Sequence, residues 1–384
     1  MSGLDDQRII TGDVLDGIRT LPDGSVDCVV TSPPYWGLRD YHVDGQIGLE
    51  ETPDEWCDRL VEVFRECRRV LADHGTLWVN CGDAYASQGG ERKEGSHGGG
   101  VGRGNAPGAR LSVDGVKPKD LIGLPWMLAF ALRADGWWLR SEIIWAKPNP
   151  MPESVRDRPT KGHEQIFLMS KRPRYYYDAD TIRQPYVGSD RPRRHDEPSL
   201  HVVPGNGPQM GLRGCDDRNG RGANARTVWQ IATQPFPEAH FATFPEELPR
   251  RCITAGCPER VCTVCGEPST RIVERHRVGD WNPRETDDSK VARTTNGHGA
   301  STFYQQPTPT TVGWTDCGHD AWRHGVVLDP FCGSGTTLQV ARRLNRHGIG
   351  TELNPEYAAI AARRIGDEPR PQGVQLEITY GEHQ

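Results

Sequence analysis

The sequence predicts an α/β fold built around a mostly parallel sheet, and chain length and the lack of repeats limit the alternatives. Short apolar stretches alternate with amphipathic stretches of helical spacing, which is the pattern of strands joined by crossover helices. The chain has 384 residues, enough for one large domain or two to three ordinary ones. It contains no repeat with a period of about 20 to 50 residues, which excludes solenoids and propellers.

The expected elements follow one another with few interruptions. Bulky side chains recur at helical spacing over residues 53–71, which predicts an amphipathic helix. Asp120 is expected to be the N-cap of a further helix that runs to about Arg133. The other expected elements are strands at residues 8–11, 26–31, 76–80, 138–145, 164–169, 325–329 and 348–352, and helices at 336–345 and 355–365.

Composition limits the classes of function. The net charge of −6 excludes a continuous basic surface for nucleic acid but leaves room for local basic patches. No apolar run approaches the roughly 18 residues of a membrane helix, and the N-terminus lacks a secretory pattern, so a cytoplasmic protein without a membrane partner is expected. Eleven cysteines in such a chain favour reduced thiols with one metal site over a disulfide framework.

The sharpest motif near the C-terminus is Val327-Leu-Asp-Pro-Phe-Cys-Gly-Ser-Gly-Thr-Thr337, which predicts a strand, a glycine turn and a helix start. Glycines let a ligand approach the backbone, and a helix N-terminus presents free N–H groups. The motif is neither a dinucleotide fingerprint nor a phosphate loop. Glu352 stands 17 positions after Gly335 at a strand end, where a carboxylate suits two ribose hydroxyls. The competing interpretation is an ordinary strand–turn–helix unit with a chance carboxylate.

A second motif, Ser32-Pro-Pro-Tyr35, directly follows an expected strand. The two prolines remove two backbone donors and hold their neighbours extended. Carbonyl groups are then left beside the Ser32 hydroxyl and the Tyr35 ring, a set that can accept hydrogen bonds from an amino group and stack on its ring. Taken alone, Pro-Pro after a strand is also typical of a stiffened loop.

Together the two motifs resemble those of the β-class DNA amino-methyltransferases, an N4-cytosine and N6-adenine family that uses S-adenosylmethionine. The tetrapeptide precedes the glycine motif, as in the β class, whose order is a circular permutation of the common methyltransferase fold. The similar stretches cover roughly residues 8–82, 120–182, 240–257 and 325–365. The resemblance implies a Rossmann-like seven-stranded methyltransferase sheet, circularly permuted, with target-recognition and cysteine-rich inserts.

The resemblance also implies an arrangement of strands and regions. Strand 326–329 would lie between strand 348–352 and the strand that leads into Ser32, so that both motifs share the ligand-binding edge of the sheet. The implied regions are a catalytic half at 1–182 with a basic glycine-rich loop at 85–119, a target-recognition region at 183–239, a cofactor-binding half at 240–257 and 325–384, and a Cys/His insert at 258–320.

Residue roles follow from the same resemblance. Ser32, Pro33, Pro34 and Tyr35 would be catalytic: Ser32 Oγ and the Pro33 carbonyl accept from the amino group, while Tyr35, helped by Trp36, stacks on a flipped base. Serine in the first position favours cytosine N4, and adenine N6 is the alternative. The implied cofactor residues are Asp329, Phe331, Gly333, Gly335 and Thr336 at the methionine end, Glu352 on the ribose, Asp13 near the adenine, and Phe241 and Thr243 closing the site.

Double-stranded DNA is the implied substrate, so phosphate binding must come from local basic patches. The arginine-rich segment 183–226 occupies the place of the target-recognition region, although a loop of solvated charges is the other interpretation. A cognate restriction endonuclease is an expected partner, and the source is a bacterium, an archaeon or a phage. The candidate DNA contacts are Arg191, Arg193, Arg194, Arg213, Arg218, Arg221 and Arg226.

The cysteine-rich insert suggests a metal. Cys262-Thr-Val-Cys265 is followed about fifty residues later by Cys317-Gly-His319. Each pair can supply two ligands to one tetrahedral Zn²⁺, which would give this polar insert the folding energy that it lacks. Reduced structural thiols or a redox pair are the competing interpretations. A catalytically inactive, zinc-containing DNA-binding protein is the alternative function from a different class.

Overall fold

The computed structural model describes residues 6–37, 43–86, 116–184, 223–234, 244–273, 311–367 and 375–379. The chain divides into two compact units, of which unit 1 comprises Met1–Asp178, Arg226–Thr270 and Asp316–Gln384. Unit 2 comprises Ala179–Ala225 and Arg271–Thr315. Most of the basic loop and several predicted site residues lie outside the described residues, namely Phe241, Thr243, Arg191, Arg193, Arg194, Arg213, Arg218 and Arg221.

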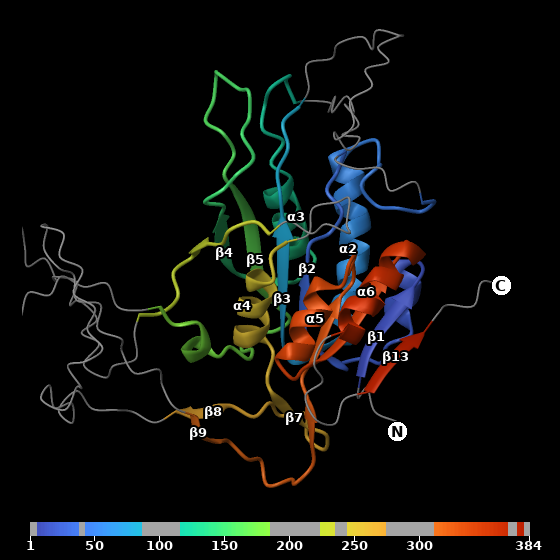
Figure 1. Ribbon diagram of the computed structural model, residues 1–384, viewed down its shortest axis with the longest axis vertical. Helices are drawn as coiled ribbons and strands as arrows, with labels where there is room; N and C mark the ends of the chain where they lie inside the picture. The colour runs from blue at the N-terminus through green and yellow to red at the C-terminus, as the bar shows by residue number, and fades with distance from the viewer. Residues whose placement is uncertain are drawn as a thin grey trace, which may run out of the picture. The chain divides into compact units, whose positions relative to one another are not determined.

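A nine-stranded sheet forms the centre of unit 1 (Figure 1). Its strands are β1 (Asp6–Thr11), β2 (Val26–Thr31), β3 (Leu71–Cys81), β4 (Trp138–Ala146), β5 (His163–Ser170), β6 (Val228–Gln230), β11 (Val326–Asp329), β12 (His347–Glu352) and β13 (Gln375–Thr379). Their order across the sheet is β13-β1-β12-β11-β2-β3-β5-β4-β6. The expected neighbours of β11 are thus confirmed. The expected number of seven strands is wrong, because β13 and β6 add one outer strand at each side of the sheet.

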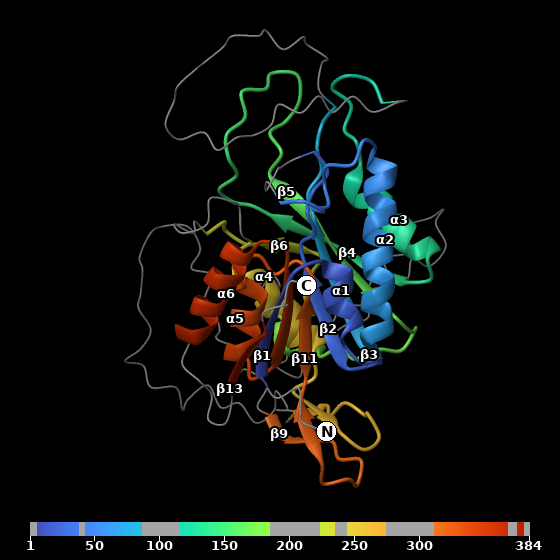
Figure 2. The ribbon, with the colours of Figure 1, turned by 90° about the vertical axis from the view of Figure 1, so that its right-hand side faces the viewer.

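Helices cover both faces of this sheet. They are α1 (Val14–Arg19), α2 (Pro53–Val70) and α3 (Leu124–Ala134) on one face, and α4 (Glu247–Gly256), α5 (Thr336–Arg343) and α6 (Pro355–Asp367) on the other (Figure 2). Neighbouring residues of β1 show the alternation of a strand, because Ile10 packs on the α1 and α2 side while Ile9 packs against α5 and α6.

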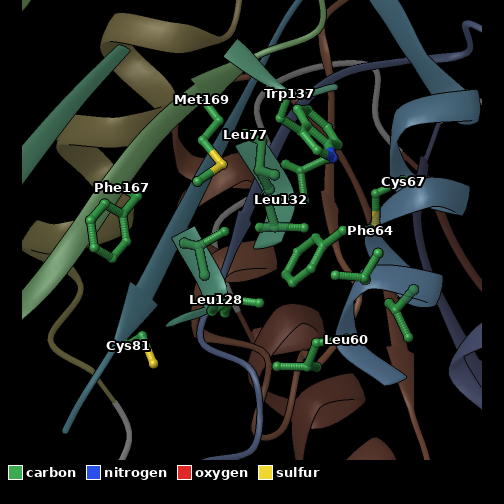
Figure 3. Close-up of a cluster of buried hydrophobic side chains, with 14 of the residues drawn as sticks. Leu60, Phe64, Cys67, Leu77, Cys81, Leu128, Leu132, Trp137, Phe167 and Met169 are labelled. Carbon is green, nitrogen blue, oxygen red and sulfur yellow. The ribbon is translucent and has the colours of Figure 1, made fainter. Parts of the chain in front are cut away.

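The largest part of the core lies between α2, α3 and the sheet. Leu60 and Phe64 of α2 face Leu128 and Leu132 of α3 in Figure 3, and all four side chains are almost completely buried. Burying each such side chain contributes about 1.5–3 kcal/mol. Helix α2 begins where the sequence predicts, because Thr52 and its partner Glu55 form a reciprocal capping box.

Helix α3 begins later than predicted. Its N-cap is Gly123, with a φ of 87°, and not Asp120. The carboxylate of Asp83, in the segment after β3, accepts hydrogen bonds from the N–H groups of Gly123 and Leu124 at 2.9 and 3.0 Å. Asp120 instead accepts from the N–H of Lys117, within the preceding turn. A capping residue so distant in the sequence leaves no local signal, which explains the error.

Smaller elements complete the described residues. In unit 1, β7 (Arg260–Cys262) pairs antiparallel with β10 (Trp322–His324). Unit 2 contains a short 3₁₀ turn and an antiparallel pair, β8 (Arg271–Val273) with β9 (Thr311–Trp314). Among the helices that the structure describes, none is both long and apolar enough to cross a membrane.

Candidate active site

Residues from distant parts of the sequence meet at one edge of the sheet. Strands β1, β12, β11, β2 and β3 run parallel, so their C-terminal ends share this edge. The end of β4 and the beginning of β5 lie there too, because β5 is antiparallel to both β3 and β4. The glycine motif after β11 and the tetrapeptide after β2 therefore occupy the same edge, as predicted.

The glycine turn leads into α5 and presents backbone groups. Gly333 and Gly335 have φ angles of 51° and 80°, which glycine adopts most easily. A side chain at Gly333 would meet nothing within 4 Å, whereas one at Gly335 would lie 2.8 Å from Cβ of Ala361 in α6. None of the described side chains caps the N-terminus of α5. The turn therefore leaves free space at Gly333 next to unpaired helical N–H groups, which suits an anionic group.

An arginine from α6 holds this turn. Arg364 Nη1 donates to the carbonyl and the hydroxyl of Ser334 at 2.7 and 2.8 Å and to Thr336 Oγ1 at 3.1 Å. These bonds fix the turn before any ligand arrives.

Glu352 connects the end of β12 to the glycine turn. Its carboxylate accepts hydrogen bonds from the N–H groups of Gly333 at 2.8 Å and Asn354 at 2.9 Å. Burial raises the pKa of Glu352 to about 7, although these two donors oppose the shift. Each carboxylate oxygen keeps a second lone pair, so the side chain can still accept from a ligand's hydroxyls.

Asp329 is buried within the framework of the site, with 1% of its surface exposed. It accepts hydrogen bonds from the hydroxyls of Thr31 and Thr337 at 2.7 and 2.6 Å and from the N–H of Phe331 at 3.1 Å. Burial raises its pKa to about 6, against the effect of these donors. The Asp329 carboxylate thus links β11 to β2 and to α5. Its predicted role at the methionine end is therefore indirect, because it holds the glycine turn in place.

Asp13 lies one strand further along the same edge. It is the N-cap of α1 and accepts from the N–H groups of Leu15 and Asp16 at 2.8 and 3.2 Å. The neighbouring Gly12 N–H donates to the carbonyl of Glu352 at 2.9 Å. Asp13, predicted to lie near the adenine, and Glu352, predicted to bind the ribose, are therefore at the ends of two paired strands.

The Ser-Pro-Pro-Tyr segment contains a chain of hydrogen bonds. Ser32 Oγ donates to Tyr35 Oη at 3.1 Å, and Tyr35 Oη lies 3.0 Å from Glu164 Oε2 and 3.3 Å from Asn80 Oδ1. Glu164 also forms an ion pair with Lys147. Burial, and next to it the charge of Glu164, raises the pKa of Tyr35 well above its usual value, so the hydroxyl keeps its proton. With its own proton directed at Tyr35, Ser32 Oγ has lone pairs free to accept from another group.

The two prolines differ in what their carbonyls contact. The Pro34 carbonyl accepts a hydrogen bond from Trp56 Nε1 at 2.8 Å, which ties the segment to α2. Within the described residues, no donor reaches the Pro33 carbonyl. Trp36 is only 4% exposed, and its Nε1 donates to the Glu50 carbonyl at 2.8 Å. The suggestion that Trp36 helps to stack on a base is therefore wrong, because its ring belongs to the core.

Three functional residues in this structure, Glu164, Lys147 and Arg364, were not predicted from the sequence. Glu164 and Lys147 come together because Trp145 of β4 pairs with Glu164 of β5 across an antiparallel ladder. The sequence did contain a signal for this pair. Glu164 begins one expected strand, and Lys147 comes just after the expected strand before it. No sequence pattern pointed to Arg364, because it meets Ser334 and Thr336 only when α6 packs on the glycine turn.

Comparison with known proteins identifies the family. The family model described as DNA methylase, of the N6 and N4 type, matches residues 26–264 and 321–363. The chain belongs to the DNA methylase family. Type II methyltransferase M.SmaI of Serratia marcescens is 40% identical over 365 residues, which are 95% of this chain and 92% of the relative. Type II methyltransferase M.Cfr9I of Citrobacter freundii is 38% identical over 370 residues, which are 95% of this chain and 89% of the relative.

Solved structures share the fold. The PvuII DNA methyltransferase, described as cytosine-N4-specific, aligns with a TM-score of 0.53 over 95% of this chain and 88% of its own, at 16% identity. The α/β fold expected from the motifs is thus the fold of known DNA methyltransferases.

Two further predicted groups are outside the glycine motif and the tetrapeptide. The ligand atoms of Cys262, Cys265, Cys317 and His319 all lie within 4.8 Å of one another. Arg226, which precedes β6, is exposed, and its carbonyl accepts from Trp229 Nε1 at 3.0 Å.

Proposed function

We propose that this member of the DNA methylase family is a site-specific methyltransferase that uses S-adenosylmethionine and methylates the exocyclic amino group of a base, with cytosine N4 favoured. The proposal depends above all on one observation. Ser32, with its lone pairs free, stands at the same sheet edge as the glycine turn and Glu352. An acceptor for an amino group and a place for a nucleoside cofactor are thus on neighbouring strands.

The residues present suit S-adenosylmethionine. The open space at Gly333 and the free N–H groups of α5 would hold its carboxylate, Glu352 would accept from its ribose hydroxyls, and Asp13, on the neighbouring strand end, is the candidate contact for its adenine. When bound, the cofactor supplies an electrophilic sulfonium methyl group. Phe241 and Thr243 remain candidates for closing this site.

The chain's own residues prepare the nucleophile. An exocyclic amino nitrogen is a poor nucleophile because its lone pair is delocalised into the ring. Ser32 Oγ and the Pro33 carbonyl accept from its two N–H groups, which favours a tetrahedral nitrogen. The ring of Tyr35 stacks on the flipped base. As the nitrogen gains its methyl group and releases a proton, Ser32 takes this proton and passes its own to Tyr35, which in turn protonates Glu164. Holding the groups in line contributes several kcal/mol, on the order of 7 or more in favourable cases.

Cytosine N4 is favoured over adenine N6 because serine, and not aspartate, precedes Pro-Pro-Tyr, as in N4 enzymes of the family. The fold shared with a cytosine-N4-specific enzyme agrees with this choice but does not decide it. Mass spectrometry of nucleosides from treated double-stranded DNA distinguishes the two products. Methylation at adenine N6 alone would contradict the assignment while leaving the reaction class intact.

Substitutions test the catalytic assignment. Ser32→Ala and Tyr35→Ala are each expected to lose at least about a hundredfold in kcat. Binding of S-adenosylmethionine, measured by calorimetry, should stay within about threefold of wild type because the glycine turn is intact. Wild-type methyl transfer in both variants would refute the roles. A protein with no cofactor binding at all would favour the inactive DNA-binding alternative.

Target recognition is assigned to residues 183–239, with Arg226 as the described representative of the arginine set. Replacing this region with that of a relative of different specificity should change the sequence that is methylated. Methylation that stays on the original site would place recognition elsewhere. A cognate restriction endonuclease that cuts the unmethylated site is the partner that this activity calls for.

A further inference from the structure

Three thiols and an imidazole converge at the edge of the sheet opposite the proposed active site. Cys262 ends β7, and His319 comes shortly before β10, whose last residue leads through Gly325 into the N-terminal end of β11. The Sγ atoms of Cys262 and Cys317 lie 3.6 and 3.5 Å from Nδ1 of His319. With Cys265, the four ligand atoms all lie within 4.8 Å of one another.

These spacings agree with a tetrahedral zinc ion. Arms of about 2.3 Å to sulfur and 2.0–2.1 Å to nitrogen, at the tetrahedral angle, put sulfur and nitrogen about 3.5 Å apart. Both sulfur–nitrogen distances in the structure match this value. A disulfide would use only two of the three thiols and would not explain why the imidazole faces two of them.

The backbone around the cluster is shaped for thiolates. The N–H groups of Val264 and Cys265 point at Cys262 Sγ, at 3.4 and 3.5 Å, so two donors stabilise negative charge on this sulfur. Gly266 and Gly318 have φ angles of 74° and 82°, which turn the chain sharply beside each half of the cluster. Asp316 accepts from the N–H of Gly318 at 2.8 Å and fixes the second turn.

The two halves are also held together by strands. Trp322 pairs with Cys262 in the β7–β10 ladder, and the Thr263 N–H donates to the Ala321 carbonyl at 2.9 Å. Arg323 of β10 anchors the ladder to the sheet, because it donates to the buried carboxylate of Asp27 at 2.5 and 3.1 Å. The ligand positions are thus set by the framework before a metal binds. Cys265, Cys317 and His319 are all at least partly exposed, so an ion can reach them.

We propose that Cys262, Cys265, Cys317 and His319 bind one structural Zn²⁺. All four ligands are protein side chains, so the site has no open position for substrate, as in closed structural zinc sites. The ion joins Cys262 and Cys265 to Cys317 and His319, about fifty residues later in the sequence, and so closes the chain between the two pairs at its ends. The proposal is independent of the methyl-transfer chemistry, which takes place at the other edge.

Metal content is the first test. Full-length protein purified without chelators should contain about one zinc per chain by elemental analysis, and treatment with a thiol-modifying mercurial should release it. Zinc well below about 0.2 per chain, iron in its place, or a disulfide among Cys262, Cys265 and Cys317 by mass spectrometry would overturn the proposal.

Ligand variants separate coordination from general damage to the fold. His319→Cys should keep about one metal per chain, because a four-thiolate site also binds zinc, whereas His319→Ala should lose it at least about tenfold more readily to a chelator. The cobalt-substituted protein should show tetrahedral d–d absorption that shifts towards a four-sulfur pattern in His319→Cys. Cys57→Ala, a buried thiol in α2, is the matched control and should keep its zinc. Equal metal retention in His319→Ala and wild type would refute the assignment.

Discussion

The hydroxyl of Tyr35 fixes the direction in which the Ser32 hydroxyl points its proton. It accepts a hydrogen bond from the Ser32 hydroxyl and lies within hydrogen-bonding distance of Glu164, which in turn contacts Lys147. Removal of the hydroxyl frees the Ser32 proton to rotate toward the substrate, where it competes with the amino group. The aromatic ring and its stacking are unaffected by that change.

Tyr35→Phe is therefore expected to lower kcat by about 10- to 100-fold, the value of one or two orienting hydrogen bonds. The Kd for S-adenosylmethionine should not change. Single-turnover methylation measures the first quantity and calorimetry the second. Tyr175→Phe removes a hydroxyl that accepts a hydrogen bond from Arg140 at an exposed position and plays no part in the Ser32–Tyr35 segment, so it is the control. Equal rates for the two variants would contradict the relay.

Glu352 makes stability depend on pH in an unusual direction. Its pKa is about 7 in the folded protein, against roughly 4.3 in an unfolded chain. Between these values the folded state binds more protons than the unfolded state. The contribution of Glu352 to the free energy of unfolding therefore falls as pH rises from about 4.5 to about 7.

Glu352→Gln removes this titration while keeping an acceptor for Gly333. The cofactor-free variant should be more stable than wild type at pH 8, by about 1–2 kcal/mol, and should lose less stability between pH 5.5 and 8. Its affinity for S-adenosylmethionine should drop by about tenfold or more, because the charged acceptor for the ribose is gone. Urea denaturation across a pH series and calorimetry measure the two effects. The same pH slope in both proteins would refute the interpretation.

Helices α5 and α6 and the glycine turn act as one structural element. Arg364 of α6 holds the turn by its side chain, and Ala361 packs against Gly335 so closely that no Cβ fits. Gly333, two residues earlier, has open space in front of it. The structural role of Gly335 and the proposed binding role of Gly333 therefore belong to positions two residues apart.

Alanine substitutions should resolve these two roles. Gly335→Ala is expected to cost about 2–3 kcal/mol of stability, since it combines a left-handed φ with a clash against α6. Gly333→Ala should cost only about 1–2 kcal/mol, the cost of its left-handed φ alone, but weaken binding of S-adenosylmethionine by at least about tenfold, because the new methyl group occupies the cofactor's approach. Denaturant unfolding and calorimetry on both variants test this contrast. A larger loss of stability in Gly333→Ala would contradict it.

Over the whole molecule, sequence patterns predicted the elements whose signals are local. The strand ending at Asp329, the glycine turn and the capped helix α2 all follow from neighbouring residues. The strand order followed from the family resemblance and not from the pattern itself. Contacts that form only after folding escaped prediction, such as Asp83 capping α3 and Lys147 pairing with Glu164. The edge strands β6 and β13 were also missed, because segments of three and five residues carry little periodicity.

Asp27 lies near the N-terminal ends of the parallel strands, opposite the active site, and its contacts hold several strands together at this edge of the sheet. Its carboxylate, from β2, bonds to His74 of β3 at 2.9 Å, to Arg323 of β10 and to the N–H of Val326 in β11 at 2.8 Å. Burial alone would raise the pKa of Asp27, but the hydrogen bonds from His74 and Arg323 outweigh it and leave the pKa below its usual value. The ionised carboxylate thus connects four strands.

Asp27→Asn should consequently destabilise the whole unit, by about 3–5 kcal/mol, because it leaves the guanidinium of Arg323 without its buried counterion. The expected result at pH 7.5 is a lower urea midpoint with an unchanged Kd for S-adenosylmethionine in the protein that remains folded, since the cofactor site lies at the opposite edge. Asp23→Asn breaks an ion pair with Arg69 in which the aspartate is 78% exposed, and it should cost less than about 1 kcal/mol. Equal losses in the two variants would show that the buried position of Asp27 does not matter, and a weakened cofactor affinity in Asp27→Asn would show that the two edges are coupled.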